Sequence, residues 1–136
     1  MKVRSYIASS DERFVFTSFC LQTGVLATEL HDLLHASAKL MVALAPHEKR
    51  ADGSDLLYGW AGRVGDELVY AYVKHDVRKF PVIPRLMEAL GFDTKKPLVV
   101  RFNSLAMRTV VAAFRWPATF KESSHVRREE TGPEAA

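Results

Sequence analysis

Hydrophobic positions along the chain follow two spacings, and clusters of turn residues separate the segments that carry them. Short apolar segments predict six strands, at residues 3–7, 40–45, 56–64, 67–74, 97–102 and 116–120. Apolar residues three to four positions apart predict four helices, at residues 9–24, 26–34, 82–90 and 104–114. The order β-α-α-β-β-β-α-β-α-β predicts an α+β fold with one mixed central sheet flanked by helices.

Local signals place the ends of several elements. Ser9 and Glu12 have the spacing of a capping box, so we expect the first helix to begin at Ser9. Gly24 suits the end of that helix. Pro46 predicts the end of the strand before it, and a polar loop should follow over residues 47–55.

Gly65 and Asp66 form a two-residue connection between two predicted strands. Glycine in the first position is typical of a type II′ turn, so we expect these strands to be antiparallel neighbours. From residue 123 the chain is polar and charged, which predicts a tail without fixed structure after a single domain over residues 1–122.

Composition supports one globular domain. The chain has 136 residues, of which 48% are hydrophobic and 26% charged, and this balance argues against a disordered chain. A single cysteine excludes an intramolecular disulfide framework. The chain has no apolar run of roughly 18 residues, and it begins with charges where a signal peptide needs an apolar stretch. We therefore expect a soluble, cytoplasmic protein without membrane contact.

The basic excess lies in the second half of the chain. The net charge is +3, yet residues 1–37 carry three Lys or Arg against four Asp or Glu, and residues 38–73 carry four against five. Residues 74–136 carry twelve against seven. This asymmetry predicts a polyanionic partner for the C-terminal half: a nucleic acid, a phosphate-rich cofactor or an acidic protein. A solvated face with a basic tail explains the same numbers.

Residues 68–87 carry a more specific pattern. Tyr72 and Val73 end a predicted strand as an aromatic–Val pair, and a loop containing Arg78 leads into the next helix. Together with the element order, this segment resembles the GNAT superfamily of acyl-CoA N-acyltransferases, where such a strand precedes a loop of pattern (Q/R)-x-x-G-x-(G/A). The similarity in order covers most of the chain, and the motif covers about residues 56–90. Within the superfamily, the chain most resembles small members from bacteria and their phages.

The resemblance implies an acetyl-CoA site. In the family, backbone N–H groups of the loop and of the following helix hold the CoA diphosphate, and the free strand edge pairs with the pantetheine arm. The implied reaction is direct attack of a small-molecule or peptide amine on the thioester. Carried over by position, the implied cofactor-binding residues are Tyr72, Val73, Arg78, Lys79, Phe80, Val82, Ile83, Arg85 and Asn103.

The chain departs from the family pattern in the loop. Aligned from Arg78, Pro81 and Ile83 stand where the family has small residues, and Pro84 follows. Neither proline has a backbone N–H, and Ile83 adds bulk. Each lost charge-assisted hydrogen bond removes about 1.5–3 kcal/mol, so the pattern predicts weakened CoA binding.

A second departure concerns the proton donor. The family's N-x-x-A-x-x-x-Y pattern is matched at Asn103 and Ala106, but Val110 stands at the tyrosine position. Valine cannot donate a proton, and the candidate replacements are Ser104 and a water molecule.

Two residues are candidate general bases. Glu67 begins a predicted strand, and His75 follows its end, where an imidazole can titrate near neutral pH. For each of them the alternative is a solvated surface residue.

Other reactive side chains point less clearly to chemistry. His31 and His35 are spaced as in zinc proteases, but no clear third ligand follows, so we predict no metal site. Cys20 lies on a largely apolar helix without an evident histidine partner, which favours a packing thiol.

These patterns predict a GNAT-like N-acetyltransferase-type protein that binds acetyl-CoA, or a catalytically degraded relative of one. The alternative is a non-catalytic, phage-encoded binding protein that engages an acidic protein or a nucleic acid through its basic C-terminal half.

Overall fold

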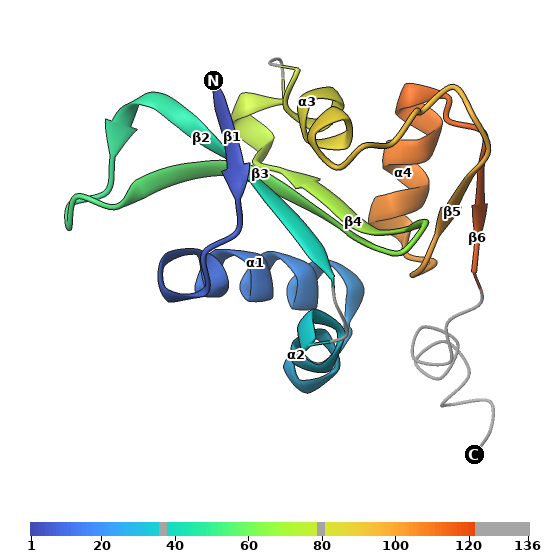
Figure 1. The fold of residues 1–136 in the computed structure, drawn as a ribbon, viewed down its shortest axis with the longest axis horizontal. Coiled ribbons are helices and arrows are strands. Elements are labelled where there is room, and N and C mark those ends of the chain that lie inside the picture. Colours follow the sequence, from blue (N-terminus) through green and yellow to red (C-terminus); the bar gives the residue numbers. More distant parts are fainter. Residues whose placement is uncertain (36–37, 79–80, 122–136) are drawn as a thin grey trace.

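A computed structural model describes residues 1–35, 38–78 and 81–121, which form one six-stranded sheet and four helices (Figure 1). The strands are β1 (Lys2–Ser5), β2 (Lys39–Lys49), β3 (Asp55–Val64), β4 (Glu67–Val73), β5 (Leu98–Val100) and β6 (Ala118–Phe120). The helices are α1 (Ala8–Thr23), α2 (Ala27–His35), α3 (Val82–Ala89) and α4 (Leu105–Phe114), with a 3₁₀ turn, η1, at His75–Val77. The predicted α+β class with a mixed sheet is confirmed, and the predicted tail lies outside the described residues.

The sheet follows chain order from β1 to β6. Strands β1 to β4 are antiparallel, whereas β4 with β5 and β5 with β6 are parallel. Parallel neighbours need a crossover connection, and α3 and α4 provide the two crossovers. Figure 1 shows α1 and α2 on one side of the sheet, α3 on the other and α4 next to β5.

The turn between β3 and β4 forms as its sequence predicts. Val64 pairs with Glu67 across the two-residue connection. Gly65 has a φ of 56°, whereas Asp66 is not among the residues with positive φ. This combination fits a type II′ turn, and the two strands are antiparallel neighbours.

Aromatic side chains join α1 to the middle of the sheet. Phe19 makes edge-to-face contacts with Trp60 and Tyr70, at ring-centroid distances of 6.0 and 5.3 Å. All three residues are buried, and the indole N–H of Trp60 donates to Ser18 Oγ at 2.7 Å. The indole is thus buried without leaving its N–H unsatisfied.

Gly59 allows α3 to lie closely against the sheet. A Cβ at this position would overlap the carbonyl oxygen of Tyr72 and lie 3.2 Å from Val82 Cγ1. The first turn of α3 therefore packs where β3 has no side chain.

The start of α1 differs from the prediction. The helix begins at Ala8, with Ile7 as N-cap and no side-chain cap. The prediction of a capping box at Ser9 and Glu12 is therefore wrong. Asp11 replaces it, because its carboxylate accepts the N–H of Ile7 at 2.8 Å.

Arg4 explains why Asp11 takes that position. Its guanidinium donates to both oxygens of Asp11, at 2.6 and 3.0 Å, and to Asp55 Oδ2 at 3.0 and 3.2 Å. Asp11 is almost fully buried. Burial by itself raises the pKa of Asp11, but the hydrogen bonds from Arg4 and from the Ile7 N–H outweigh burial and hold that pKa below its usual value. Arg4 thereby joins β1, α1 and β3.

Pro46 does not end β2, as we had expected from its position. The strand continues to Lys49, and the predicted polar loop shrinks to residues 50–54. The register with β3 is irregular between Leu44 and Lys49, so Pro46 falls where no regular pair requires its missing N–H.

We expect Asp11→Asn to lower the free energy of unfolding at pH 7 by about 2 kcal/mol or more, because the buried end of the Arg4 pair loses its charge. Since the folded pKa of Asp11 is depressed, this stabilisation is complete above the unfolded pKa of about 3.9 and is lost as pH falls through the folded pKa. Urea unfolding of wild type and variant at pH 7 and at several lower pH values measures the difference. Asp32→Asn, at an exposed position on α2, is the control, and equal pH profiles for both variants would contradict the expectation.

Candidate functional site

The pairing between β4 and β5 ends after two residues. Glu67 pairs with Val99 and Leu68 with Val100. The N–H of Arg101 then donates to the carbonyl of Leu68 at 2.8 Å. From this point the strands separate, and within the described residues β4 has no further strand partner on this side.

The remaining edge of β4 exposes backbone groups to the gap. Backbone polar groups of an antiparallel strand alternate between its two sides, and in β4 the alternation restarts at the register shift between Leu68 and Tyr70. The N–H of Lys74 donates to the carbonyl of Tyr58 in β3 at 2.8 Å, so the groups of Lys74 face β3. Those of Ala71 and Val73 therefore face the opposite side, where β5 has already separated.

A cavity of about 600 Å³ lies at this gap, between β4 and α4. Its walls are largely apolar, and α1 and the start of α3 complete them. The lining residues are Leu21, Gln22, Tyr70, Ala71, Tyr72, Val73, Arg78, Ile83, Leu105, Ala106, Thr109, Val110, Ala113 and Phe114. We call this cavity the β4–α4 cleft.

Four of the predicted cofactor residues line the β4–α4 cleft: Tyr72, Val73, Arg78 and Ile83. Val110, at the family's tyrosine position, also lies in its wall.

The other predicted cofactor residues lie elsewhere. Val82 is fully buried beneath Gly59, and Arg85 is exposed on α3. Asn103 accepts a hydrogen bond from Arg108 at 2.7 Å. Lys79 and Phe80 lie outside the described residues.

The candidate base Glu67 is held by two cations. Arg101 and Lys121 contact its two carboxylate oxygens at 2.9 and 3.0 Å. Partial burial raises the pKa of Glu67, but the hydrogen bonds from Lys121 and Arg101 outweigh it, and the pKa lies below its usual value. Glu67 stands at the start of β4, away from the open end of the strand.

His75 and Ser104 also have defined places. His75 is exposed in η1, just beyond the end of β4. Ser104 is buried and caps α4, because its Oγ accepts the N–H of Met107 at 3.2 Å.

The cleft also contains residues that the sequence did not single out. Leu21 and Gln22, at the end of α1, form part of the wall, and Leu21 is 81% exposed. The Tyr70 hydroxyl donates to Gln22 Oε1 at 3.5 Å. In the sequence, Leu21 and Gln22 belong only to a helical pattern. That pattern does not indicate that the end of α1 reaches the gap between β4 and β5.

The remaining candidate chemistry adds little to the site. His31 lies on α2, and the side chain of His35 lies outside the described part. Among the described side chains, no group of three His, Cys, Asp or Glu residues could hold a metal ion. Burial raises the pKa of the Cys20 thiol.

No helix in the described ranges is long and apolar enough to cross a membrane.

A second cavity, of about 540 Å³, shares Phe114 with the β4–α4 cleft. Phe114 and Trp116 stack at a centroid distance of 5.3 Å and an interplanar angle of 18°. Lys95 and Arg115 add positive charge to its lining. This cavity thus combines aromatic rings with two cations.

Comparisons with protein-family models and with curated proteins find no match to this chain.

We expect Tyr70→Phe to change how stability depends on alkaline pH. Burial raises the pKa of Tyr70 above its usual value of about 10, so the folded state keeps the proton after the unfolded chain has lost it. The contribution of Tyr70 is complete below pH 10 and is lost as pH rises through the folded pKa. Urea unfolding from pH 7 to 11 should show a shallower alkaline decline for the variant, with a loss of about 1 kcal/mol or less at pH 7. An equally steep decline in both proteins would contradict this.

Proposed function

We propose that the β4–α4 cleft binds an acyl-CoA thioester and that the protein is an N-acyltransferase-type protein of the GNAT kind. The observation that carries the proposal is the separation of β4 from β5 after Leu68, which turns the backbone groups of Ala71 and Val73 toward a cavity of about 600 Å³. An extended amide-containing arm can pair with such an edge as an added strand does. The order of strands and helices and the mixed sheet support the same proposal.

The residues present fit the parts of such a molecule. Ala71 and Val73 offer backbone donors and acceptors to the two amides of pantetheine, and the apolar face of α4 covers its carbon chain. The first turn of α3 offers the N–H of Ile83, which lines the cleft, to the diphosphate, with Arg78 beside it. Pro84 offers none, so this end of the site has fewer donors than a helix start normally provides.

The nucleotide end fits the second cavity. The stacked rings of Phe114 and Trp116 offer a surface for a purine, and Lys95 and Arg115 offer charge to a phosphate. Because Phe114 lines both cavities, one extended ligand can occupy them together.

When bound, an acyl-CoA supplies a thioester carbonyl, whose attack by an amine forms a C–N bond, breaks the C–S bond and leaves the amine proton on the departing sulfur. Before attack, an ammonium acceptor must first lose its extra proton, and the described lining of the cleft contains no Asp, Glu or His that could accept it. That first proton must therefore go to water, which predicts slow transfer that becomes faster as pH rises. Because burial raises the pKa of Tyr70, its hydroxyl keeps its proton at neutral and mildly alkaline pH.

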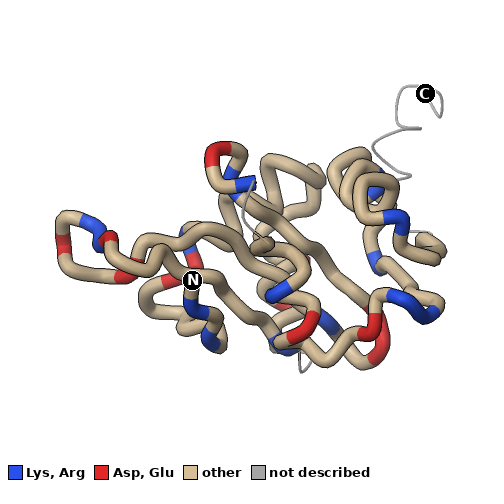
Figure 2. Tube along the Cα trace, turned by 90° about the horizontal axis from the view of Figure 1, so that it is seen from above, with Lys and Arg blue, Asp and Glu red and all other residues tan. Residues whose placement is uncertain are grey.

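The alternative, a polyanion-binding protein, has less support from the arrangement of charges. Arg101 and Lys121 share Glu67, and Arg108 is bonded to Asn103. Figure 2 shows basic positions interspersed with acidic ones along the chain, rather than gathered in one stripe.

We expect acetyl-CoA to bind with a micromolar Kd and Ala113→Trp to weaken binding at least tenfold, because the indole would fill the cleft. Ala113 is exposed enough to accept a larger side chain. Ala112→Trp, on the preceding residue of the same helix and outside the cleft lining, is the matched control and should bind as the wild type does. Calorimetry measures both. No heat at millimolar acetyl-CoA, or equal weakening by both variants, would refute the proposal.

We also expect Pro84→Ala to tighten acetyl-CoA binding by up to about tenfold, because alanine restores a backbone N–H in the first turn of α3. Pro84 is exposed, so the change should leave the fold intact. Pantetheine, which lacks the diphosphate, serves as the control ligand and should bind both proteins equally. A parallel gain for both ligands would show that the effect does not come from the diphosphate.

A further inference from the structure

A third cavity, of about 510 Å³, adjoins the β4–α4 cleft on the α1 side of the sheet. It is lined by one face of α1, by Arg50 in the β2–β3 connection and by Tyr72. Leu21, Gln22 and Tyr72 line both cavities, so the two spaces meet at these side chains. We call this cavity the arginine pocket.

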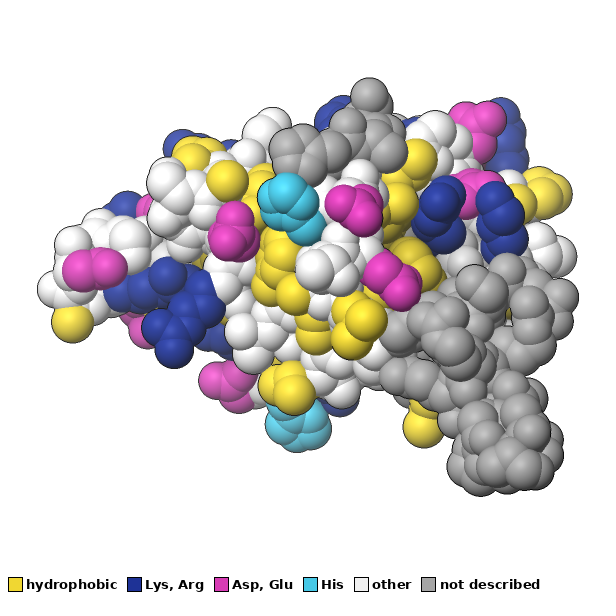
Figure 3. Space-filling view, turned by 90° about the horizontal axis from the view of Figure 1, so that it is seen from below, with side chains coloured by type: hydrophobic (Ala, Val, Ile, Leu, Met, Phe, Trp, Pro, Cys, Tyr) yellow, Lys and Arg dark blue, Asp and Glu magenta, His cyan; other side chains and the backbone are white. Residues whose placement is uncertain are grey.

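Two guanidinium groups give the arginine pocket its charge. Arg13 and Arg50 both line it, and no carboxylate does among the described residues. Asp52, near Arg50, is already hydrogen-bonded to Ser54, through both its hydroxyl and its N–H, at 2.6 and 2.9 Å. Figure 3 shows Lys and Arg side chains gathered beside the β2–β3 hairpin on this face.

Four of the other seven arginines in the described ranges have side-chain partners, whereas Arg78, Arg85 and Arg115 form no hydrogen bond or ion pair there. Arg4 and Arg101 form ion pairs, and Arg63 donates to the carbonyl of Leu90 at 2.6 Å. The side chains of Arg13 and Arg50 also form no hydrogen bond or ion pair with described residues, although the Asp52 carboxylate acts electrostatically on Arg50. What sets Arg13 and Arg50 apart is that both line one cavity that no described carboxylate lines, an arrangement suited to an anionic group.

We propose that the arginine pocket is the acceptor site and that it recognises a small primary amine bearing a carboxylate or phosphate, with Arg13 and Arg50 holding the anionic group. This inference rests on the proposed acyl-CoA function. With the anion at the arginines, Phe14 and Leu21 contact the carbon chain, and the amine points toward Tyr72, where the two cavities join. The pocket volume suits a small molecule.

Binding is measured by calorimetry on the full chain, with and without saturating acetyl-CoA. The probes are 2-aminoethyl phosphate and 4-aminobutyrate, with ethanolamine and butylamine as their uncharged-tail counterparts. At least one anionic amine should bind at least tenfold more tightly than its counterpart. Comparing the two anionic amines shows whether phosphate or carboxylate is preferred.

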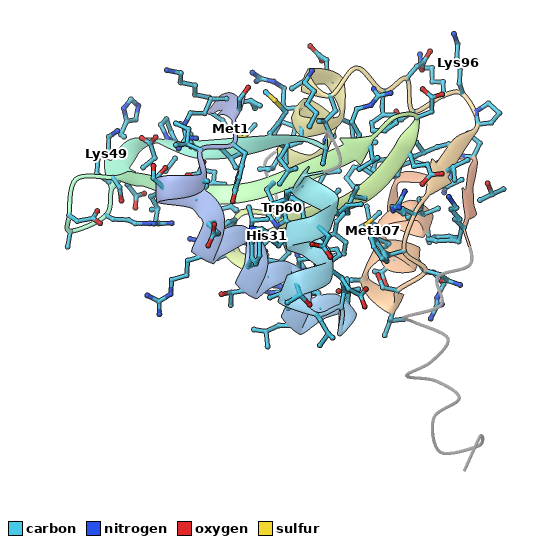
Figure 4. All side chains as sticks on the ribbon, turned by 60° about the horizontal axis from the view of Figure 1, so that its bottom comes forward. Met1, His31, Lys49, Trp60, Lys96 and Met107 are labelled. Atoms are coloured by element: carbon cyan, nitrogen blue, oxygen red, sulfur yellow. The ribbon has the colours of Figure 1, made fainter. Side chains whose placement is uncertain are left out.

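Arg13→Gln and Arg50→Gln should each weaken binding of that amine about tenfold. Neither arginine side chain forms a hydrogen bond or ion pair with the described residues, so the variants should fold as the wild type does. Lys96→Gln is the control for the lost charge; Figure 4 places Lys96 at the opposite end of the molecule from Lys49, which precedes Arg50 in the chain.

The results separate the two hypotheses. If acetyl-CoA does not bind but an anionic amine still binds through the arginines, the anion site is supported and the acyl-CoA function fails. If acetyl-CoA binds but neither anionic amine binds more tightly than its counterpart, with or without it, the inference is overturned and the acyl-CoA function stands. Equal weakening by Lys96→Gln and the arginine variants would also overturn it.

Discussion

The sheet is continuous across β4 and β5 only as far as Leu68, whose carbonyl accepts the N–H of Arg101. A seven-residue strand thus meets a three-residue strand over two pairs, and the rest of its edge needs another partner. Phe19 and Phe102 meet edge to face at 5.5 Å and fill part of the space between α1 and the strand ends. What remains is the β4–α4 cleft, with polar backbone on one wall and an apolar helix on the other.

Much of the fold could be predicted because its signals are local. Gly65 has the conformational freedom that the hairpin needs, and the Oγ of Ser104 satisfies an N–H at the start of α4. The errors arose where a distant residue overrode a local signal. Asp11 displaced the expected cap at Ser9 because Arg4, on the neighbouring strand, holds its carboxylate.

The candidate site could be predicted only in part, for the same reason. Tyr72 and Val73 were found because the pattern along one strand is visible in the sequence, and both line the cleft. Gln22 and Arg13 belong to a helix whose pattern shows only which face packs inward. That this helix ends beside the gap depends on how early β4 and β5 separate, which no single segment encodes.

Glu67 has a consequence for how the outer wall of the cleft is held. Besides the two strand pairs, its carboxylate links β4 to Arg101, after β5, and to Lys121, after β6. The backbone ladder that joins the β5–α4–β6 segment to the sheet is therefore short, with one carboxylate at its start. Packing of α4 on α1 and β4, and of Phe102 on Phe19, supplies the rest of the attachment. The outer wall of the cleft is thus held in place mainly by core side chains, so a substitution in that core would change the width of the cleft without touching its lining.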